Sequence, residues 1–248
     1  MAGAIPSIRP RRGKGFWALL LGAALSFAAF LALGGWQVQR LAWKQDLIAR
    51  VEQRLAAAPA APPEAGMPIE RATHEYLRVA LRGEFDHGRE ALVTASTALG
   101  SGYWLLTPLR AEQDGRWYWI NRGFLPRRGA ARERPPGTQA VAGLLRLTEP
   151  GGSLLQANQP AAQRWYSRDV AALSAATGLP EAAVAPFFID VWPAPGQAPD
   201  EVKAWPHPGL TVLSFSNNHR VYALTWFALA AMVAGAALYL LRTPPRAP

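Results

Sequence analysis

Two apolar runs without a charged residue, one near each end of the chain, most constrain what this sequence can fold into. They are residues 16–36 (FWALLLGAALSFAAFLALGGW) and residues 221–241 (VYALTWFALAAMVAGAALYLL). At about 1.5 Å per residue, a helix made from either run is about 30 Å long, which matches the hydrocarbon core of a bilayer. The sequence therefore predicts two transmembrane helices that flank a long intervening segment.

Each apolar run has an alternative interpretation. The first could be a cleaved signal peptide, because small residues (Ala32, Gly34 and Gly35) lie near its end. It is, however, longer than the apolar region of a signal peptide, which has about 7–15 residues. The second could be a buried core helix, but a core helix that is apolar on every face over this length is unusual. Two membrane spans remain the favoured interpretation.

Basic residues flank both runs on the sides that face the chain ends. Four lie within residues 9–14 and two within residues 242–246. Positive residues favour the cytoplasmic side, whereas long loops are translocated largely regardless of charge. We therefore expect a multi-pass protein of the bacterial inner membrane with cytoplasmic tails at 1–15 and 242–248. The central segment would be periplasmic, or would face the intermembrane space if the membrane is the mitochondrial inner membrane of a eukaryote.

The helical period continues beyond the first run, over residues 37–58 (QVQRLAWKQDLIARVEQRLAAA). Residues spaced at i, i+4, i+7 and i+11 share one face: Trp36, Arg40, Trp43 and Leu47. We expect a helical stalk over 37–58, in which Arg40 can stack on an indole one turn away. Prolines between 59 and 63 end this helix, and residues 59–72 are expected to form a linker.

The central part of the chain changes to a period of two, which is typical of strands. Strand candidates are residues 76–85, 90–97, 103–109, 116–124, 141–147, 187–191 and 211–215. Residues 167–177 predict a short helix with Ser167 as N-cap and Gly178 as stop, and residues 193–208 predict a loop. Residues 73–220 are therefore expected to form a β-rich α+β extracytoplasmic domain, built on a twisted antiparallel sheet or partial barrel.

The sequence carries no signature of a catalytic centre, so we expect no enzymatic activity. GxSxG, HExxH and phosphate-loop motifs are absent, and no two of the 4 histidines are three or four residues apart. The absence of cysteine excludes disulfides, Cys-based zinc sites, iron–sulfur ligation and covalent haem attachment.

The net charge of +9 is scattered along the chain, so nucleic acid is not an expected partner. His87 and His207 are expected in solvated turns or loops.

His219 has a different setting, because it lies in SNNHRVYALTW at the mouth of the second run. An imidazole there is about one turn above the hydrocarbon boundary, where it could bind the iron of a haem. Arg220, Arg40 and Lys44 lie at a depth where their cationic groups could meet haem propionates. The alternative is that one of the two preceding asparagines caps the helix and His219 only lies among lipid headgroups.

Four blocks of sequence carry a resemblance to a known family. They are 34–48 (GGWQVQRLAWKQDLI), 102–109 with 119–126 (GYWLLTPL and WINRGFLP), 143–146 with 158–169 (GLLR and NQPAAQRWYSRD), and 209–230 (GLTVLSFSNNHRVYALTWFALA). The chain resembles the Surfeit-locus (Surf-one/Shy-one) family of cytochrome c oxidase assembly factors over nearly its whole length. The resemblance lies in these blocks, in their order along the chain and in the two flanking spans.

The resemblance implies a chaperone of the respiratory chain that supports maturation of the haem- and copper-bearing subunit of a terminal oxidase. Bacterial members are implicated in handling haem a, and the family's histidine before the second span matches His219. The expected site for transiently bound haem a consists of His219 as iron ligand, with Arg220, Arg40, Trp36 and Trp43 around it. Membrane anchoring and packing are the alternative roles of the two tryptophans.

The resemblance also sets the expected partners, which are the catalytic subunit of the oxidase, further assembly factors and the lipid bilayer. The alternative function is a scaffold that stabilises an oxidase assembly intermediate without haem. Small residues could then permit close helix contacts: Gly22, Ala29, Gly235 and Ala236. Among the other matched residues, Arg122 is expected to pair with a carboxylate where a strand ends, and Gly123 to allow a tight turn.

Overall fold

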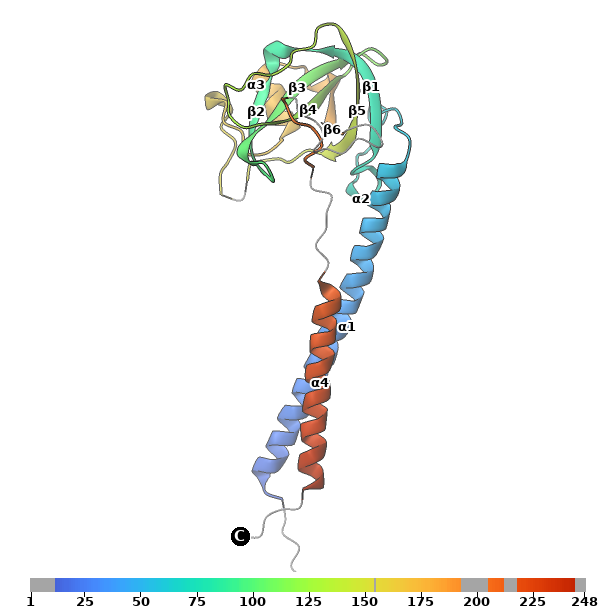
Figure 1. Ribbon diagram of the computed structural model, residues 1–248, viewed down its shortest axis with the longest axis vertical. Helices are drawn as coiled ribbons and strands as arrows, with labels where there is room; N and C mark the ends of the chain where they lie inside the picture. The colour runs from blue at the N-terminus through green and yellow to red at the C-terminus, as the bar shows by residue number, and fades with distance from the viewer. Residues whose placement is uncertain (1–11, 154, 193–204, 212–217, 244–248) are drawn as a thin grey trace, which may run out of the picture. The chain divides into compact units, whose positions relative to one another are not determined.

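A computed structural model of the protein describes residues 12–153, 155–192, 205–211 and 218–243. The chain divides into two units, shown in Figure 1. Of the described residues, those within 12–49 and 218–243 belong to a unit of two long helices, and those within 50–211 belong to a β-barrel domain.

The helical unit contains α1 (Lys14–Ala56), whose last turns from Arg50 belong to the barrel unit, and α4 (His219–Arg242). Both are long and apolar enough to cross a membrane. As expected, α1 is one uninterrupted helix that contains the first apolar run and continues into the stalk segment, but it ends at Ala56 rather than at residue 58. Figure 1 shows α1 and α4 side by side, and Arg12 near the start of α1 donates a hydrogen bond to the carbonyl of Leu241 at the end of α4. The two helices are therefore antiparallel.

The contact between α1 and α4 follows a spacing of alternately three and four residues. The shielded positions of α1 that follow this spacing are Phe16, Leu20, Ala23, Phe27, Phe30, Gly34 and Gln37. Those of α4 that follow it are His219, Ala223, Trp226, Ala230, Val233, Ala237 and Leu240. A mean spacing of 3.5 residues is typical of left-handed coiled coils, in which two helices share one continuous seam. We call these positions the helix seam.

Small residues allow the two helices to approach closely at particular points of the seam. A Cβ atom on Gly34 would lie 2.6 Å from Cε1 of Phe227, and Ala223 and Ala230 are buried. The ring of Phe30 stacks on Trp226 with 5.7 Å between centroids. The four small residues expected to permit close contacts are exposed on other faces of the helices, so they do not hold α1 against α4: Gly22, Ala29, Gly235 and Ala236.

The barrel domain contains six strands. They are β1 (Arg78–Phe85), β2 (Ala91–Thr97), β3 (Gly100–Ala111), β4 (Trp117–Leu125), β5 (Thr138–Leu147) and β6 (Val184–Val191). The strand order is β1-β5-β6-β4-β3-β2, and β1 also pairs with β3, which closes five strands into a barrel. β2 lies outside this ring on β3. The partial barrel expected from the sequence is confirmed, except that β4 and β6 are parallel. A parallel pair needs a long crossover, which β5 and the helical segment after it provide.

Two features of β3 and β4 follow from their sequence. The hairpin between them turns at Gly115, where φ is 68°, and Asp114 accepts a hydrogen bond from the backbone N–H of Arg116 at 3.0 Å. Pro108 lacks a backbone N–H, and it lies in β3 between residues 100–106, which pair with β2, and residues 109–111, which pair with β1. Proline therefore occupies the point where β3 changes neighbours.

Two large apolar clusters, and a smaller one of Leu105, Leu125 and Ala130, hold the barrel together. The first contains buried side chains of the closed strands: Leu81, Leu109, Tyr118, Ile120, Leu145, Phe187 and Ile189. The second packs α3 (Val170–Thr177) against the sheet through Leu106, Trp119, Trp165, Leu173 and Phe188. Each fully buried large side chain contributes about 1.5–3 kcal/mol. The indole N–H of Trp119 donates to the Ser174 hydroxyl at 2.9 Å, so burial leaves it paired.

The cap predicted for this helix is wrong by two residues. Asp169, not Ser167, caps α3, because its carboxylate accepts the N–H of Ala172 at 3.1 Å. The Ser167 hydroxyl instead donates to the carbonyl of Glu149 at 2.6 Å. The predicted stop is confirmed, since Gly178 has a φ of 70°.

The remaining elements are short. They are α2 (Arg71–His74), η1 (His87–Arg89), η2 (Pro160–Ala162) and η3 (Glu181–Ala183). Within residues 59–72, Ala60 pairs with β1, because its N–H donates to Arg78 and its carbonyl accepts from Ala80. Residues 193–204 of the predicted loop and residues 212–215 of the last strand candidate lie outside the described residues. Thr211 is described and is not in a strand.

Candidate functional site

The helical unit contains all five residues that the sequence assigns to a haem site. His219 is the first residue of α4, and it is half-buried. Asn218 occupies the N-cap position, but its side chain accepts no capping hydrogen bond. Asn218 therefore occupies the position expected of a cap without making the bond.

The imidazole of His219 faces α1 across the helix seam. Its Nδ1 atom lies 2.7 Å from Oε1 of Gln37, a side chain that is 9% exposed. An amide oxygen only accepts, so this contact is a hydrogen bond in the tautomer that carries its proton on Nδ1. In a neutral ring the lone pair then resides on Nε2, which is the nitrogen available to a metal.

The other predicted residues flank this pair without joining it. Arg40 is one turn beyond Gln37, and its guanidinium carbon lies 4.1 Å from the ring centre of Trp43. The predicted stacking of Arg40 on an indole is therefore confirmed for Trp43. Trp36 and Trp43 remain about half exposed, and Arg220 is exposed next to His219. At 100° per residue, Arg40 is rotated by about 60° and Trp36 by about 100° from Gln37 around α1.

Gln37 is the residue that the sequence reasoning missed. The signal was present, because Gln37 is the polar member of an otherwise apolar or small series at a spacing of 3.5 residues: Phe16, Leu20, Ala23, Phe27, Phe30 and Gly34. A polar side chain at a seam position must find a partner on the facing helix. The facing residue could not be known from the sequence, because it depends on how the two helices are aligned.

Asp190 is the centre of a buried polar network in the barrel domain. Its carboxylate is 2% exposed and accepts hydrogen bonds from Asn121 and Thr211, each at 2.8 Å, and from Arg146 at 3.0 Å. Arg146 also donates to Glu75 at 2.7 Å. Burial alone would lower the pKa of Arg146, but the Asp190 and Glu75 carboxylates outweigh it and raise that pKa. The groups neutralise one another, which indicates a structural role.

Glu90 is the centre of a second polar cluster. Arg132 and Arg134 lie 2.9 Å from its carboxylate, and Arg122 lies 3.7 Å away. The predicted pairing of Arg122 with a carboxylate is thereby confirmed. The expectation that Arg122 and Gly123 end a strand is wrong, because β4 continues to Leu125.

The two barrel histidines that we expected in solvated positions are more enclosed than predicted. His207 is 8% exposed, because its backbone pairs with Phe124 at the end of β4. His87 is half-buried, with Nδ1 3.2 Å from Glu90 and Nε2 3.1 Å from the carbonyl of Pro135. Both expectations were wrong because each histidine also contacts a segment distant in the sequence, Pro135 for His87 and Phe124 for His207.

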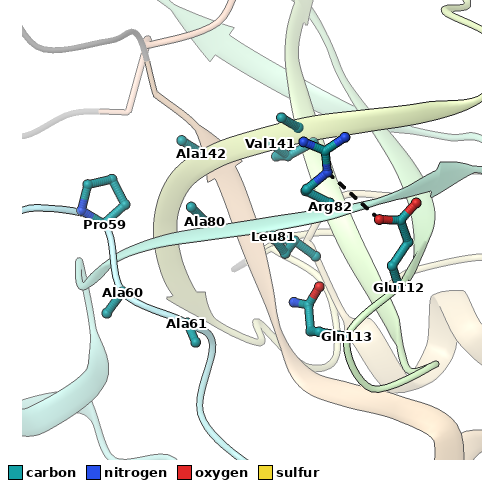
Figure 2. A pocket seen from close by; sticks show the side chains of 11 residues that line it. Pro59, Ala60, Ala61, Ala80, Leu81, Arg82, Glu112, Gln113, Val141 and Ala142 are labelled. Carbon is teal, nitrogen blue, oxygen red and sulfur yellow. Dashed lines mark ion pairs between the residues drawn. The ribbon is translucent and has the colours of Figure 1, made fainter.

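The hollow on the barrel that Figure 2 shows does not gather catalytic groups. It has a volume of about 660 Å³, and most of its lining residues are small or apolar. Its charged lining consists of Arg82 and Glu112, an exposed pair at 3.7 Å. It contains neither a histidine nor a hydroxyl nucleophile. Across the residues that the structure describes, no group of three or more His, Cys, Asp or Glu side chains could hold a metal ion.

Comparison with known proteins places this arrangement in context. The model of the SURF1 family matches residues 24–231. The chain is 34% identical to Surfeit locus protein 1 of Mus musculus over 237 residues, which cover 87% of this chain and 72% of the mouse protein. It is 32% identical to Surfeit locus protein 1 of Homo sapiens, covering 87% of this chain and 73% of the human protein. For the SURF1-like protein of Monosiga brevicollis the identity is 30%, covering 94% and 90%. These matches confirm the resemblance inferred from the sequence blocks.

Proposed function

Because this chain belongs to the SURF1 family, known as cytochrome oxidase assembly factors, we propose that it binds haem a transiently and delivers it to the catalytic subunit of a haem-copper terminal oxidase. SURF1 assembly factors are not enzymes, which agrees with a role in handling a cofactor rather than converting it. Haem a is the cargo in this proposal, and the protein would hold it only until transfer.

The observation that carries the proposal is the position of His219. Its imidazole is at the first residue of an apolar helix, with one ring nitrogen bonded to Gln37. The other nitrogen, Nε2, would supply the axial bond to the haem iron. Arg220 follows His219, and Arg40 lies one turn beyond Gln37. Each arginine is therefore close in sequence to one member of the His219–Gln37 pair. They would bind the propionates through charge-assisted hydrogen bonds.

The aromatic residues support the same arrangement. Trp43 packs against Arg40 and so holds the guanidinium on one side of α1. Trp36 presents a half-exposed indole one turn before Arg40. In the proposal these rings cover the porphyrin edge, whereas without haem they anchor the helix at the membrane surface.

The proposal also includes a location. Two helices long and apolar enough to span a membrane support a multi-pass protein. We place it in the bacterial inner membrane, or the mitochondrial inner membrane of a eukaryote, with both termini cytoplasmic and the barrel domain on the opposite side. Its partners would be the oxidase catalytic subunit, other assembly factors and the bilayer.

The test is an absorption spectrum of the full-length protein purified in detergent from cells that make haem a. We expect a haem spectrum in the wild type and its loss or alteration in His219→Ala. His74→Ala is the matched control, because His74 lies in α2 of the barrel unit and should leave the spectrum unchanged. A normal haem content in His219→Ala would remove His219 from the ligand role.

A scaffold without haem is the second candidate function. It is favoured by the outward orientation of Gly22, Ala29, Gly235 and Ala236, which leaves them available to helices of another membrane protein. The scaffold predicts co-purification with oxidase subunits and no haem spectrum in any preparation. The same purification therefore distinguishes the two functions.

A further inference from the structure

We propose that Gln37 is a positioning residue for His219. Its amide oxygen accepts the Nδ1 proton, fixes the orientation of the imidazole ring and leaves Nε2 as the nitrogen that faces a haem iron. The iron part of this inference rests on the proposed function. The part that concerns the ring is a property of the protein without haem.

The first argument is the cost of burying Gln37. Its side chain is 9% exposed within a seam whose other α1 positions from 16 to 34 are apolar or small. A buried amide without a hydrogen bond destabilises a protein, whereas leucine at the same position would pack without that cost. A glutamine here is therefore explained by the group that it binds, and that group is Nδ1 of His219 at 2.7 Å.

The second argument is the chemistry of a metal-binding imidazole. Histidines that ligate a metal almost always donate their other ring N–H to a carboxylate, a carbonyl or water. This hydrogen bond fixes the tautomer and raises the basicity of the ligating nitrogen. The amide oxygen of Gln37 is such an acceptor, and it reaches His219 from the other helix.

The third argument is that the helix seam sets the geometry of the pair. Gly34, one turn before Gln37, contacts the ring of Phe227 so closely that a Cβ atom would lie 2.6 Å from it. Phe30 stacks on Trp226 one turn further along. Because these contacts fix how α1 and α4 are aligned, Gln37 and His219 are held opposite each other rather than meeting by chance rotation of two long side chains.

The ring part is tested on full-length protein without haem, labelled with ¹⁵N-histidine and purified in detergent. The ¹⁵N chemical shifts report which ring nitrogen carries the proton, and His219→Ala identifies the signals of His219. We expect the Nδ1–H tautomer in the wild type and in Gln37→Glu, which keeps an acceptor oxygen. Gln37→Leu should shift the population toward the Nε2–H tautomer. Gln39→Leu is the matched control, because Gln39 is exposed two residues away.

The iron part is tested by titrating the same variants with haem a. Loss of a hydrogen bond of this kind typically weakens metal binding about 10–100-fold, so we expect Gln37→Leu to bind haem that much more weakly. Gln37→Glu should restore binding and lower the midpoint potential of the iron, because a stronger acceptor makes the imidazole more basic. If Gln37 had a purely structural role, Gln37→Glu would neither restore haem binding nor change the midpoint potential of the iron.

The two proposals fail in different ways. Wild-type protein that takes up no haem a overturns the proposed function. A tautomer and a haem affinity that are the same in Gln37→Leu as in Gln39→Leu overturn the positioning role, even if His219→Ala abolishes haem binding.

Discussion

Nη1 of Arg146 lies 3.0 Å from Oδ2 of Asp190 inside the barrel domain, where the Asp190 side chain is 2% exposed. Glu75, which precedes β1, binds Arg146 from the other side, and Thr211, which follows β6, donates to Asp190. The ion pair therefore connects the segment before β1, through Glu75, to the segment after β6, through Thr211.

This relationship predicts that Asp190→Asn destabilises the barrel domain by about 3 kcal/mol. That value is the lower end of the range for breaking a buried ion pair, because Arg146 keeps its bond to Glu75. The measurement is thermal or urea unfolding of the full-length protein in detergent. Arg82→Ala is the control, since its pair with Glu112 is exposed and should contribute less than about 1 kcal/mol. Equal effects of the two substitutions would show that the buried network does not stabilise the barrel.

Gly123 gives a prediction based on the backbone. Its φ is 134°, and a Cβ atom there would collide with the carbonyl oxygen of His207. Gly123→Ala should cost at least about 1–3 kcal/mol from backbone strain and should displace the segment around His207. Gly129→Ala, in open space, should change the unfolding free energy by less than about 0.5 kcal/mol. Limited proteolysis of both variants measures the displacement, and unchanged cleavage near His207 would contradict it.

Glu90 predicts a component of acid sensitivity. Burial alone would raise its pKa, but hydrogen bonds from Arg134 and Arg132 outweigh burial and lower the pKa below the usual range of glutamate. The native state therefore binds the proton less tightly than the unfolded chain. The stabilisation is complete above the pKa of an unfolded glutamate, about 4.3, and is lost as the pH falls through the lower native pKa.

The corresponding variant is Glu90→Gln. It should lower the unfolding free energy at pH 7 and lose less further stability than the wild type when the pH falls from about 5 to about 3. Unfolding measured at both pH values tests this. Glu64→Gln, on an exposed residue, should behave as the wild type does. An identical pH dependence of Glu90→Gln and the wild type would mean that the arginines do not act through Glu90.

The parts of the fold that could be predicted from the sequence depend on local signals. The helices follow from the absence of charge over 16–36 and 221–241, and most strand limits follow from alternation within each segment. The pairing of β4 with β6 and the closure of β1 on β3 join distant segments, so no local pattern contains them. The cap of α3 shows the same limit, because Ser167 and Asp169 are equally good caps and the distant carbonyl of Glu149 takes the Ser167 hydroxyl.

The candidate site was predictable to a similar extent. His219 was identified because of its position at the mouth of an apolar run, which is a local feature. Gln37 was missed because its importance depends on the residue that faces it from α4. Arg40 was placed correctly beside an indole, since an interaction within one turn of a helix can be inferred from spacing.

The helix seam predicts which positions of α1 and α4 can be cross-linked. The chain has no cysteine, so an introduced pair provides the only thiols. Phe30→Cys with Trp226→Cys should react with a short bifunctional maleimide in membranes, because the two rings stack at 5.7 Å. Ala28→Cys with Trp226→Cys should not, since position 28 is about 160° away from position 30 around α1. Proteolytic cleavage near the exposed Leu155 then divides the chain between α1 and α4. On a denaturing gel the two fragments run together only if the cysteines have been cross-linked.

Adding Gly34→Leu to the cysteine pair tests what holds the seam together. A leucine side chain cannot fit where a single Cβ atom would already lie 2.6 Å from Phe227, so α1 and α4 should separate and the cross-linking yield should fall. Gly22→Leu is the control, because Gly22 has open space around it. If Gly34→Leu leaves the yield unchanged, the close contact with Phe227 is not what aligns the helices.

The proposed orientation predicts which engineered cysteine is accessible from outside the cell. Leu155→Cys in the barrel domain, where the side chain is 91% exposed, should react with a membrane-impermeant maleimide in intact spheroplasts. Thr243→Cys at the end of α4 should react only after lysis, because that end is expected to be cytoplasmic. The reverse pattern would contradict the orientation. His219 and Arg242 are at opposite ends of α4, so the same labelling also decides on which side of the membrane haem would have to reach the His219–Gln37 pair.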